Sequence, residues 1–134
     1  MTRQKYDVVL ACGGLGTRLR EITNNTPKPL YLIEGKSTLE RCIEQLDFYQ
    51  YKNVIITIGY KSNKFTEFIV ELNKKYKVNI DLYVEEKPLG ECGALWIIKD
   101  NLCDDFVFIN GDLIFFIDFK KLHLFHQRLS SKLT

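Results

Sequence analysis

Four short apolar or β-branched runs recur along the chain, separated by segments with helical spacing. The runs occupy residues 8–12, 54–58, 80–84 and 106–109. Runs of this length and composition are typical of buried β-strands, and their alternation with helices is the pattern of βαβ units around a parallel sheet. The pattern predicts an α/β fold, a three-layer sandwich built on a mostly parallel, Rossmann-like sheet.

The segments between the runs carry apolar residues at helical spacing. Residues 39–46 carry one apolar stripe, where Ser37 and Glu40 are spaced as a capping box at the start of the helix, and residues 65–76 carry a second apolar stripe. A third helix is expected over about residues 94–102, and a fourth after Asp118, the expected N-cap. The residues expected to face inward on these last two helices are Leu95, Ile98 and Leu102, and Leu122, Phe125 and Leu129.

The bulk composition limits the classes of partner. The chain has 134 residues, the size of one domain and enough for a substantial core. Its 19 Lys and Arg against 17 Asp and Glu give a net charge of +2, which argues against a broad basic face for nucleic acid. Residues 1–7 form no signal-peptide core, and no run approaches the about 20 apolar residues of a membrane span. A cytoplasmic protein with neither nucleic acid nor membrane as partner is expected.

Sulfur and imidazole groups show no metal-binding spacing. The four cysteines contain no Cys-x-x-Cys pair, so small buried thiols in a reducing compartment are expected, without a disulfide or zinc. They are Cys12, Cys42, Cys92 and Cys103. His123 and His126 share a helical face but have no third ligand nearby in the sequence, which favours surface histidines.

A glycine-rich loop follows the first run, with Gly13, Gly14 and Gly16 before Thr17 and Arg18. Residues without Cβ let successive N–H groups line a concave nest for phosphate oxygens. A dinucleotide loop would need glycine at position 19, and this glycine-rich loop does not contain the Gly-Lys-Ser/Thr of a Walker loop. The glycines alone are equally compatible with a tight turn.

Two cations of different geometry change this balance. Arg18 offers a planar fork that can bind two oxygens, and Lys28, between Pro27 and Pro29, offers a point charge on a stiff loop. Ligands of α/β sheets bind beyond the carboxyl ends of the strands. The loops at residues 13–18, 85–93 and 110–112 are therefore expected to converge on one polyphosphate site.

The motifs occur together in one order. They are Gly14-Leu15-Gly16-Thr17-Arg18-Leu19, Thr23, Pro27-Lys28-Pro29-Leu30, Pro88-Leu89-Gly90 with Gly93, and Asn110-Gly111-Asp112. In this order the chain resembles the sugar-1-phosphate nucleotidyltransferases over nearly its whole length. The resemblance is nearest to the guanylyltransferases that act on mannose 1-phosphate or heptose 1-phosphate.

The resemblance implies a role for each matching residue. Arg18, Lys28 and Asp112 would be catalytic, with Asp112 binding Mg²⁺, although Asp112 also reads as an ordinary turn aspartate. The residues implied to bind nucleotide are Ala11, Gly13, Gly14, Gly16, Thr17, Arg18, Glu85, Gly90, Gly93 and Asn110. The substrates would be a nucleoside triphosphate and a sugar 1-phosphate, joined by attack on the α-phosphorus with release of pyrophosphate.

The base is expected to be guanine, because a carboxylate such as Glu85 or Glu86 can accept from both N1–H and the N2 amino group. Solvated loop charges are an equal alternative for this pair, and the backbone around Gly90 and Gly93 could read the base instead. The family often has Thr-Ala where this chain has Glu91 and Cys92, and a small residue such as alanine or glycine where Cys12 stands. The change at Cys12 is mild, whereas the carboxylate of Glu91 is a larger departure.

Family members are longer than 134 residues, with a second metal-binding aspartate and most of the sugar site in later strands. Residues 1–134 are thus expected to be the N-terminal nucleotide-binding part of one nucleotidyltransferase domain, apparently truncated and inactive alone. Two alternatives remain: a cytidylyltransferase acting on phosphocholine or a related phosphate, and a non-catalytic module that binds nucleotide or nucleotide sugar. Homo-oligomerisation is left open by the sequence.

Overall fold

A four-stranded parallel sheet forms the centre of the molecule. The computed structural model describes residues 5–14, 26–59, 62–87, 89–90 and 92–134. Within them the strands are β1 (Tyr6–Ala11), β4 (Asn53–Ile58), β5 (Asn79–Val84) and β6 (Leu102–Asn110), in the order β5-β4-β1-β6. Every neighbouring pair is parallel. All four predicted strands are confirmed, and the last begins earlier than predicted.

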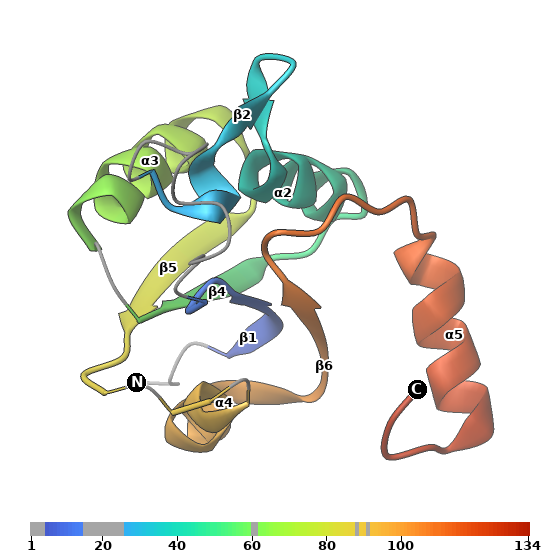
Figure 1. Ribbon diagram of the computed structural model, residues 1–134. Coiled ribbons are helices and arrows are strands. Elements are labelled where there is room, and N and C mark those ends of the chain that lie inside the picture. Colours follow the sequence, from blue (N-terminus) through green and yellow to red (C-terminus); the bar gives the residue numbers. More distant parts are fainter. Residues whose placement is uncertain (1–4, 15–25, 60–61, 88, 91) are drawn as a thin grey trace.

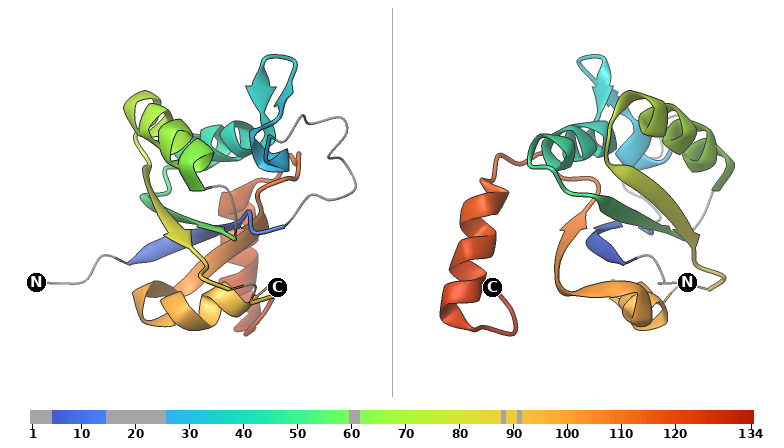
Figure 2. Two further views of the ribbon diagram at one scale, coloured as in Figure 1. Left: turned by 60° about the vertical axis from the view of Figure 1, so that its left-hand side comes forward. Right: turned by 180° about the vertical axis from the view of Figure 1, so that it is seen from behind.

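Helices cover both faces of this sheet, as Figures 1 and 2 show. Helices α2 (Thr38–Phe48) and α3 (Ser62–Lys75) lie on one face, and α4 (Gly93–Ile98) lies on the other. Successive residues of a strand point to opposite faces. Val8 and Leu10 therefore pack in the core beneath α2 and α3, while Val9 packs against Ile98 of α4. The predicted three-layer α/β architecture is confirmed.

A two-stranded hairpin that the sequence pattern does not predict leads into α2. Strands β2 (Leu32–Ile33) and β3 (Lys36–Ser37) pair antiparallel across Glu34 and Gly35. These two turn residues have φ of 52° and 78°, the left-handed values that a tight two-residue hairpin turn requires. Ser37 then caps α2, since its Oγ accepts a hydrogen bond from the N–H of Glu40 at 3.1 Å, as the capping-box spacing predicts.

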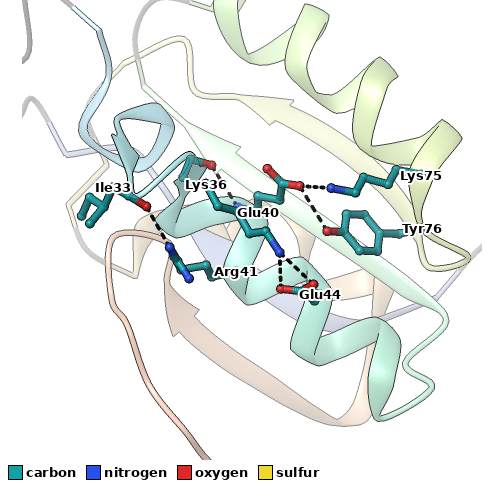
Figure 3. A network of polar contacts seen from close by, with 8 residues as sticks. Ile33, Lys36, Glu40, Arg41, Glu44, Lys75 and Tyr76 are labelled. Carbon is teal, nitrogen blue, oxygen red and sulfur yellow. Dashed lines mark hydrogen bonds and ion pairs between the residues drawn. The ribbon is translucent and has the colours of Figure 1, made fainter.

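Glu40 also ties α2 to the end of α3, as Figure 3 shows. Its Oε1 accepts hydrogen bonds from Lys75 Nζ at 2.5 Å and from Tyr76 Oη at 3.2 Å. On the neighbouring turn, Lys36 forms an ion pair with Glu44 at 2.8 Å. The Glu40 side chain is only 12% exposed, so its partners compensate a charge that is nearly removed from water. This network joins the two helices of one layer.

The connection from α4 to β6 differs from the prediction. Helix α4 ends at Ile98, the short 3₁₀ helix η3 (Lys99–Asn101) follows, and Leu102 is the first residue of β6. The prediction that Leu102 lies on the helix is wrong. Leu102 is buried with Val9 and Ile98, and burial at this position is compatible with the spacing of either element.

The last helix, α5 (Phe119–Leu129), begins as predicted. The Asp118 carboxylate accepts a hydrogen bond from the N–H of Lys121 at 3.1 Å. Figure 1 shows α5 standing beside the sheet rather than across one of its faces. It is attached through Phe119, which is 2% exposed and packs edge-on against the rings of Tyr49 and Phe115.

Two inward-facing predictions on α5 are wrong. Leu122 is half-buried, but Phe125 and Leu129 are 54% and 56% exposed. Helical spacing determines which residues share a face, whereas burial depends on whether another layer packs on that face. Among the residues that the structure describes, this face of α5 remains largely uncovered.

The cysteines are all free, and two of the four follow the prediction of burial. Cys12 and Cys42 are buried, Cys103 is half-buried, and Cys92 is exposed. The prediction is wrong for Cys92 because this residue lies in the turn that precedes α4. Within the described ranges, no helix has the length and apolar character needed to cross a membrane.

The two histidines of α5 differ in their surroundings. His123 is exposed as predicted, whereas the side chain of His126 is only 22% exposed and its Nε2 lies 3.5 Å from Asp105 Oδ1. In the part of the chain that the structure describes, no three or more His, Cys, Asp or Glu side chains are grouped so that they could hold a metal ion.

Candidate functional site

The carboxyl ends of the central strands meet at one edge of the sheet. Ala11, the last residue of β1, pairs with Thr57 of β4 on one side and with Asn110 of β6 on the other. The order of the strands reverses at β1, and such switch points are where α/β sheets bind ligands. The backbone continues this alignment past the strands, since the N–H of Cys12 donates to Thr57 O at 2.8 Å and the N–H of Gly111 donates to Ala11 O at 2.9 Å.

The first glycine of the loop is enclosed by its neighbours. A Cβ on Gly13 would lie 3.3 Å from Glu85 Oε1, and a Cβ on Gly59 would lie 3.2 Å from Gly13 O. Glycine at these two positions lets the ends of β1, β4 and β5 approach closely. Gly14, by contrast, is exposed, with open space where a side chain would stand. A ligand could therefore approach the backbone at Gly14.

Glu85 lies beside this loop at the end of β5. It is 9% exposed, its N–H donates to Ile58 O at 2.7 Å, and its Oε2 accepts a hydrogen bond from the N–H of Leu89 at 3.3 Å. Glu86, by contrast, is exposed. The two glutamates are equal candidates in the sequence, but only Glu85 is buried in the structure. Glu85 bridges the glycine loop and the loop that follows β5.

Steric constraints also favour glycine at positions 90 and 93 of the second loop. Gly90 has φ of 77°, a left-handed value that side chains rarely adopt. A Cβ on Gly93 would lie 2.3 Å from the Cβ of Leu89, closer than real atoms approach. The structure brings this loop to the edge through Glu85.

Lys28 and Asp112 meet at the same edge. Lys28 opens the 3₁₀ helix η2 (Lys28–Leu30), whose Pro29 and Leu30 are buried, while the lysine side chain is 42% exposed. Its Nζ lies 2.6 Å from Asp112 Oδ2, and the two residues are 84 positions apart in the sequence. Two of the three residues predicted to be catalytic are thus in contact.

Asp112 is a suitable single ligand for a magnesium ion. Its side chain is 33% exposed and already attracts a cation, the ammonium group of Lys28. Mg²⁺ commonly takes one or two carboxylates and completes its octahedron with phosphate oxygens and waters. The donor chemistry of Asp112 therefore fits a metal that is delivered together with a polyphosphate.

Two thiols lie beneath Asp112 without competing for that role. Burial, followed by the charges of Cys42 and Asp112, raises the pKa of the Cys12 thiol well above its usual range. Burial and the Asp112 carboxylate raise the pKa of Cys42 from 9.0 to about 12. Both sulfurs are therefore protonated near neutral pH, whereas a nucleophile or metal ligand would need the thiolate.

Several predicted site residues lie outside the described residues. These are Gly16, Thr17 and Arg18 of the glycine loop, together with Thr23, Pro88 and Glu91. Their roles stay predictions. For the residues that are described, the structure brings Ala11, Gly13, Gly14, Lys28, Glu85, Asn110 and Asp112 to one edge.

The sequence pattern did not point to three side chains of α2 that contact the Asp112 segment. Thr38, Cys42 and Gln45 each bind a backbone carbonyl that follows β6. Their spacing of i, i+4 and i+7 places them on one helical stripe, next to the apolar stripe of the same helix. The signal in the sequence that could have identified them is the helical spacing of three side chains that can donate hydrogen bonds.

Comparison with known proteins agrees with this geometry. Residues 6–134 match the profile of the family described as Nucleotidyl transferase. The bifunctional protein GlmU of Methanococcus maripaludis is 38% identical over 109 residues, which cover 81% of this chain and 25% of that protein. The mannose-1-phosphate guanyltransferase of Yarrowia lipolytica is 33% identical over 129 residues, covering 94% of this chain and 36% of that protein.

Solved structures give the same result. HddC from Yersinia pseudotuberculosis superposes with a TM-score of 0.80 and 32% sequence identity, over 90% of this chain and 54% of that chain. The complex of HddC with GMP-PN superposes with a TM-score of 0.79. The chain thus spans about half the length of HddC and a smaller share of the two curated relatives. With the strand order, the glycine-lined edge and the profile match over residues 6–134, the chain belongs to the nucleotidyl transferase family.

Proposed function

We propose that the protein to which this chain belongs transfers a nucleotidyl group from a nucleoside triphosphate to a sugar 1-phosphate and releases pyrophosphate. In this proposal residues 1–134 supply the nucleotide-binding part of the domain. The contact between Lys28 Nζ and Asp112 Oδ2, at 2.6 Å, is the observation that carries it, at the sheet edge where the glycine loop also begins. The chain spans only 54% of HddC, so the activity of the whole protein is itself part of this proposal.

The chemistry requires positioning and charge rather than a covalent nucleophile. A phosphate oxygen of the sugar phosphate attacks the α-phosphorus, a new P–O bond forms, and the bond to the pyrophosphate oxygen breaks. Lys28 would neutralise phosphate charge, and the backbone N–H groups at Gly13 and Gly14 would orient the oxygens. Asp112 would hold Mg²⁺, which when bound polarises phosphate oxygens and helps to align the two substrates.

Lys28 and Asp112 must separate for these roles. In the structure the ammonium of Lys28 occupies one oxygen of the Asp112 carboxylate. When the Asp112 carboxylate holds the metal, the Lys28 ammonium would be free to bind a phosphate of the nucleotide. Because both side chains are partly exposed, this exchange replaces a solvent-screened ion pair and costs little.

The test uses the complete gene product, a panel of nucleoside triphosphates and sugar 1-phosphates, and pyrophosphate release as the signal. Asp112→Asn should remove the magnesium dependence, because the amide is a much weaker ligand for a hard cation. Glu44→Gln is the matched control, since it neutralises the acidic partner of another ion pair, the one between Glu44 of α2 and Lys36 of the hairpin. Full magnesium-dependent activity in Asp112→Asn would contradict the assignment.

The panel also separates the alternatives. CTP with phosphocholine tests the cytidylyltransferase reading, and binding of nucleotide without product tests the non-catalytic reading. The 134-residue chain should bind nucleotide weakly and turn over little. Brisk pyrophosphate release by these residues alone would argue against that part of the proposal.

The finer proposal is that GTP is the preferred nucleotide. A mannose-1-phosphate guanyltransferase and a complex of HddC with GMP-PN are among the similar proteins, and Glu85 stands beside Gly13 with a carboxylate that can accept from the two donors of guanine. Glu85→Gln should lower the preference for GTP over UTP by roughly ten- to hundredfold, the range of one charge-assisted hydrogen bond. Glu86→Gln, at the exposed neighbour, is the control and should leave the preference unchanged.

A further inference from the structure

Three side chains of α2 bind the backbone that carries Asp112. Thr38 Oγ1 donates a hydrogen bond to Gly111 O at 3.2 Å, and Cys42 Sγ donates to Leu113 O at 3.6 Å. Gln45 Nε2 donates to Phe115 O. Successive donors of one helix thus bind every second carbonyl of one segment.

The donors and the carbonyls run in the same direction along the two segments. Residues i, i+4 and i+7 of a helix form one stripe, and the span from position 38 to 45 is about 10 Å at 1.5 Å per residue. Gly111 and Asp112 form a turn, after which the carbonyls of Leu113 and Phe115 follow along this stripe. Residues 113–118 belong to no helix or strand, so no neighbouring strand binds the carbonyls of Leu113 and Phe115. Cys42 and Gln45 of α2 bind them instead.

Thr38 also reaches the segment that carries Lys28. Its Oγ1 lies 3.3 Å from Pro29 O and 3.2 Å from Gly111 O, and the residue is 6% exposed. A hydroxyl has one proton, so the two carbonyls share it, which agrees with distances longer than a usual O–H···O bond. Pro29 adjoins Lys28 and Gly111 adjoins Asp112. One buried hydroxyl therefore links the backbones on both sides of the ion pair.

We propose that Thr38, Cys42 and Gln45 are positioning residues that hold Asp112 opposite Lys28. They contact neither nucleotide nor metal, and they act through the carbonyls of residues 111, 113 and 115. Thr38 sets the separation of the two charged residues, while Cys42 and Gln45 prevent the segment after Asp112 from moving away from α2. The consequence for metal binding rests on the proposed function, whereas the restraint on the segment does not.

The first experiment measures backbone hydrogen exchange at Leu113, whose N–H donates to Asn110 O at 3.3 Å, in the complete gene product well below the unfolding midpoint of every variant. Thr38→Val and Gln45→Met remove one donor each, and each should speed exchange at this N–H about fivefold, the effect of one typical hydrogen bond. Thr38→Ser retains the hydroxyl and should stay near the wild-type rate. Unchanged exchange in Thr38→Val and Gln45→Met would overturn the proposal.

A control separates restraint of this segment from general stability. The Asp7 carboxylate accepts hydrogen bonds from the N–H groups of Lys52 and Asn53, at 3.0 Å each, at the amino ends of the strands and away from the site. Asp7→Ala should lower the melting temperature without faster exchange at Leu113. Equal acceleration of exchange in Asp7→Ala would also overturn the proposal.

The second experiment measures cation binding, with Mn²⁺ as a paramagnetic probe in the presence of GTP and with Mg²⁺ in the turnover assay. Thr38→Val should raise the half-saturating concentration of both cations about fivefold, and Thr38→Ser should restore it. Faster exchange without a change in either cation constant would refute the positioning role. If the wild type bound Mn²⁺ but transferred no nucleotidyl group, the proposed function would fail, while exchange and Mn²⁺ binding would still decide the role of Thr38.

Discussion

Gly111 and Cys12 offer a direct test of how Asp112 is supported. A Cβ on Gly111 would lie 2.2 Å from Cys12 Sγ, whereas the next contacts are ordinary, at 3.6 Å from Ala11 O and 3.8 Å from Cys12 Cβ. Gly111 does not have the left-handed backbone that would by itself exclude a side chain. The sulfur alone therefore forbids alanine at position 111, and Gly111→Ala should be tolerated once Cys12→Ala removes it.

The magnitude follows from these contacts. Gly111→Ala forces a buried sulfur or the Asp112 turn to move, and overpacking of this kind costs about 1–3 kcal/mol. Cys12→Ala alone removes one buried heavy atom and should cost about 1 kcal/mol. In the double variant the methyl group fills part of the vacated volume, so the two costs should not add and the coupling should be about 1–3 kcal/mol in the stabilising direction.

Thermal unfolding followed by circular dichroism measures this cycle. At this chain length 1 kcal/mol corresponds to roughly 3–5 °C, so Gly111→Ala should lower the midpoint by about 3–15 °C, whereas the double variant should melt close to Cys12→Ala alone. Additive midpoint shifts, or a Gly111→Ala variant as stable as the wild type, would show that the thiol is not packed against this turn.

Three further outcomes follow from the site. Lys28→Met should tighten Mn²⁺ binding at Asp112 in the absence of nucleotide, because it removes the competing ammonium, while weakening nucleotide binding; isothermal titration measures both. At pH 8 a thiol reagent such as DTNB should label exposed Cys92 rapidly, but Cys12 and Cys42 only after unfolding, which mass spectrometry can resolve. The raised pKa of Cys42 means that the folded state holds its proton more tightly, so this contribution to stability is complete below pH 9 and decreases toward pH 12; urea titrations across that range should show the decline.

Much of the fold could be predicted because its signals are local. The apolar runs identify the strands, and the side chains of Ser37 and Asp118 cap the helices that follow them, as their positions indicate. Local patterns fail where two elements satisfy the same spacing, as at Leu102, and where a face has the right periodicity without a covering layer, as at Phe125.

The sequence by itself determined the element types and the order of the site motifs, since turn chemistry, capping and periodicity depend on residues a few positions apart. The tertiary structure decided which of these motifs touch. The parallel register at Ala11 and Asn110 brings the loops after β1 and β6 together, and tertiary packing brings Lys28 within 2.6 Å of Asp112 across 84 positions. Thr38 acquires its place between the two loops in the same way, because hydrogen bonds between distant segments exist only after packing has brought their backbones within reach.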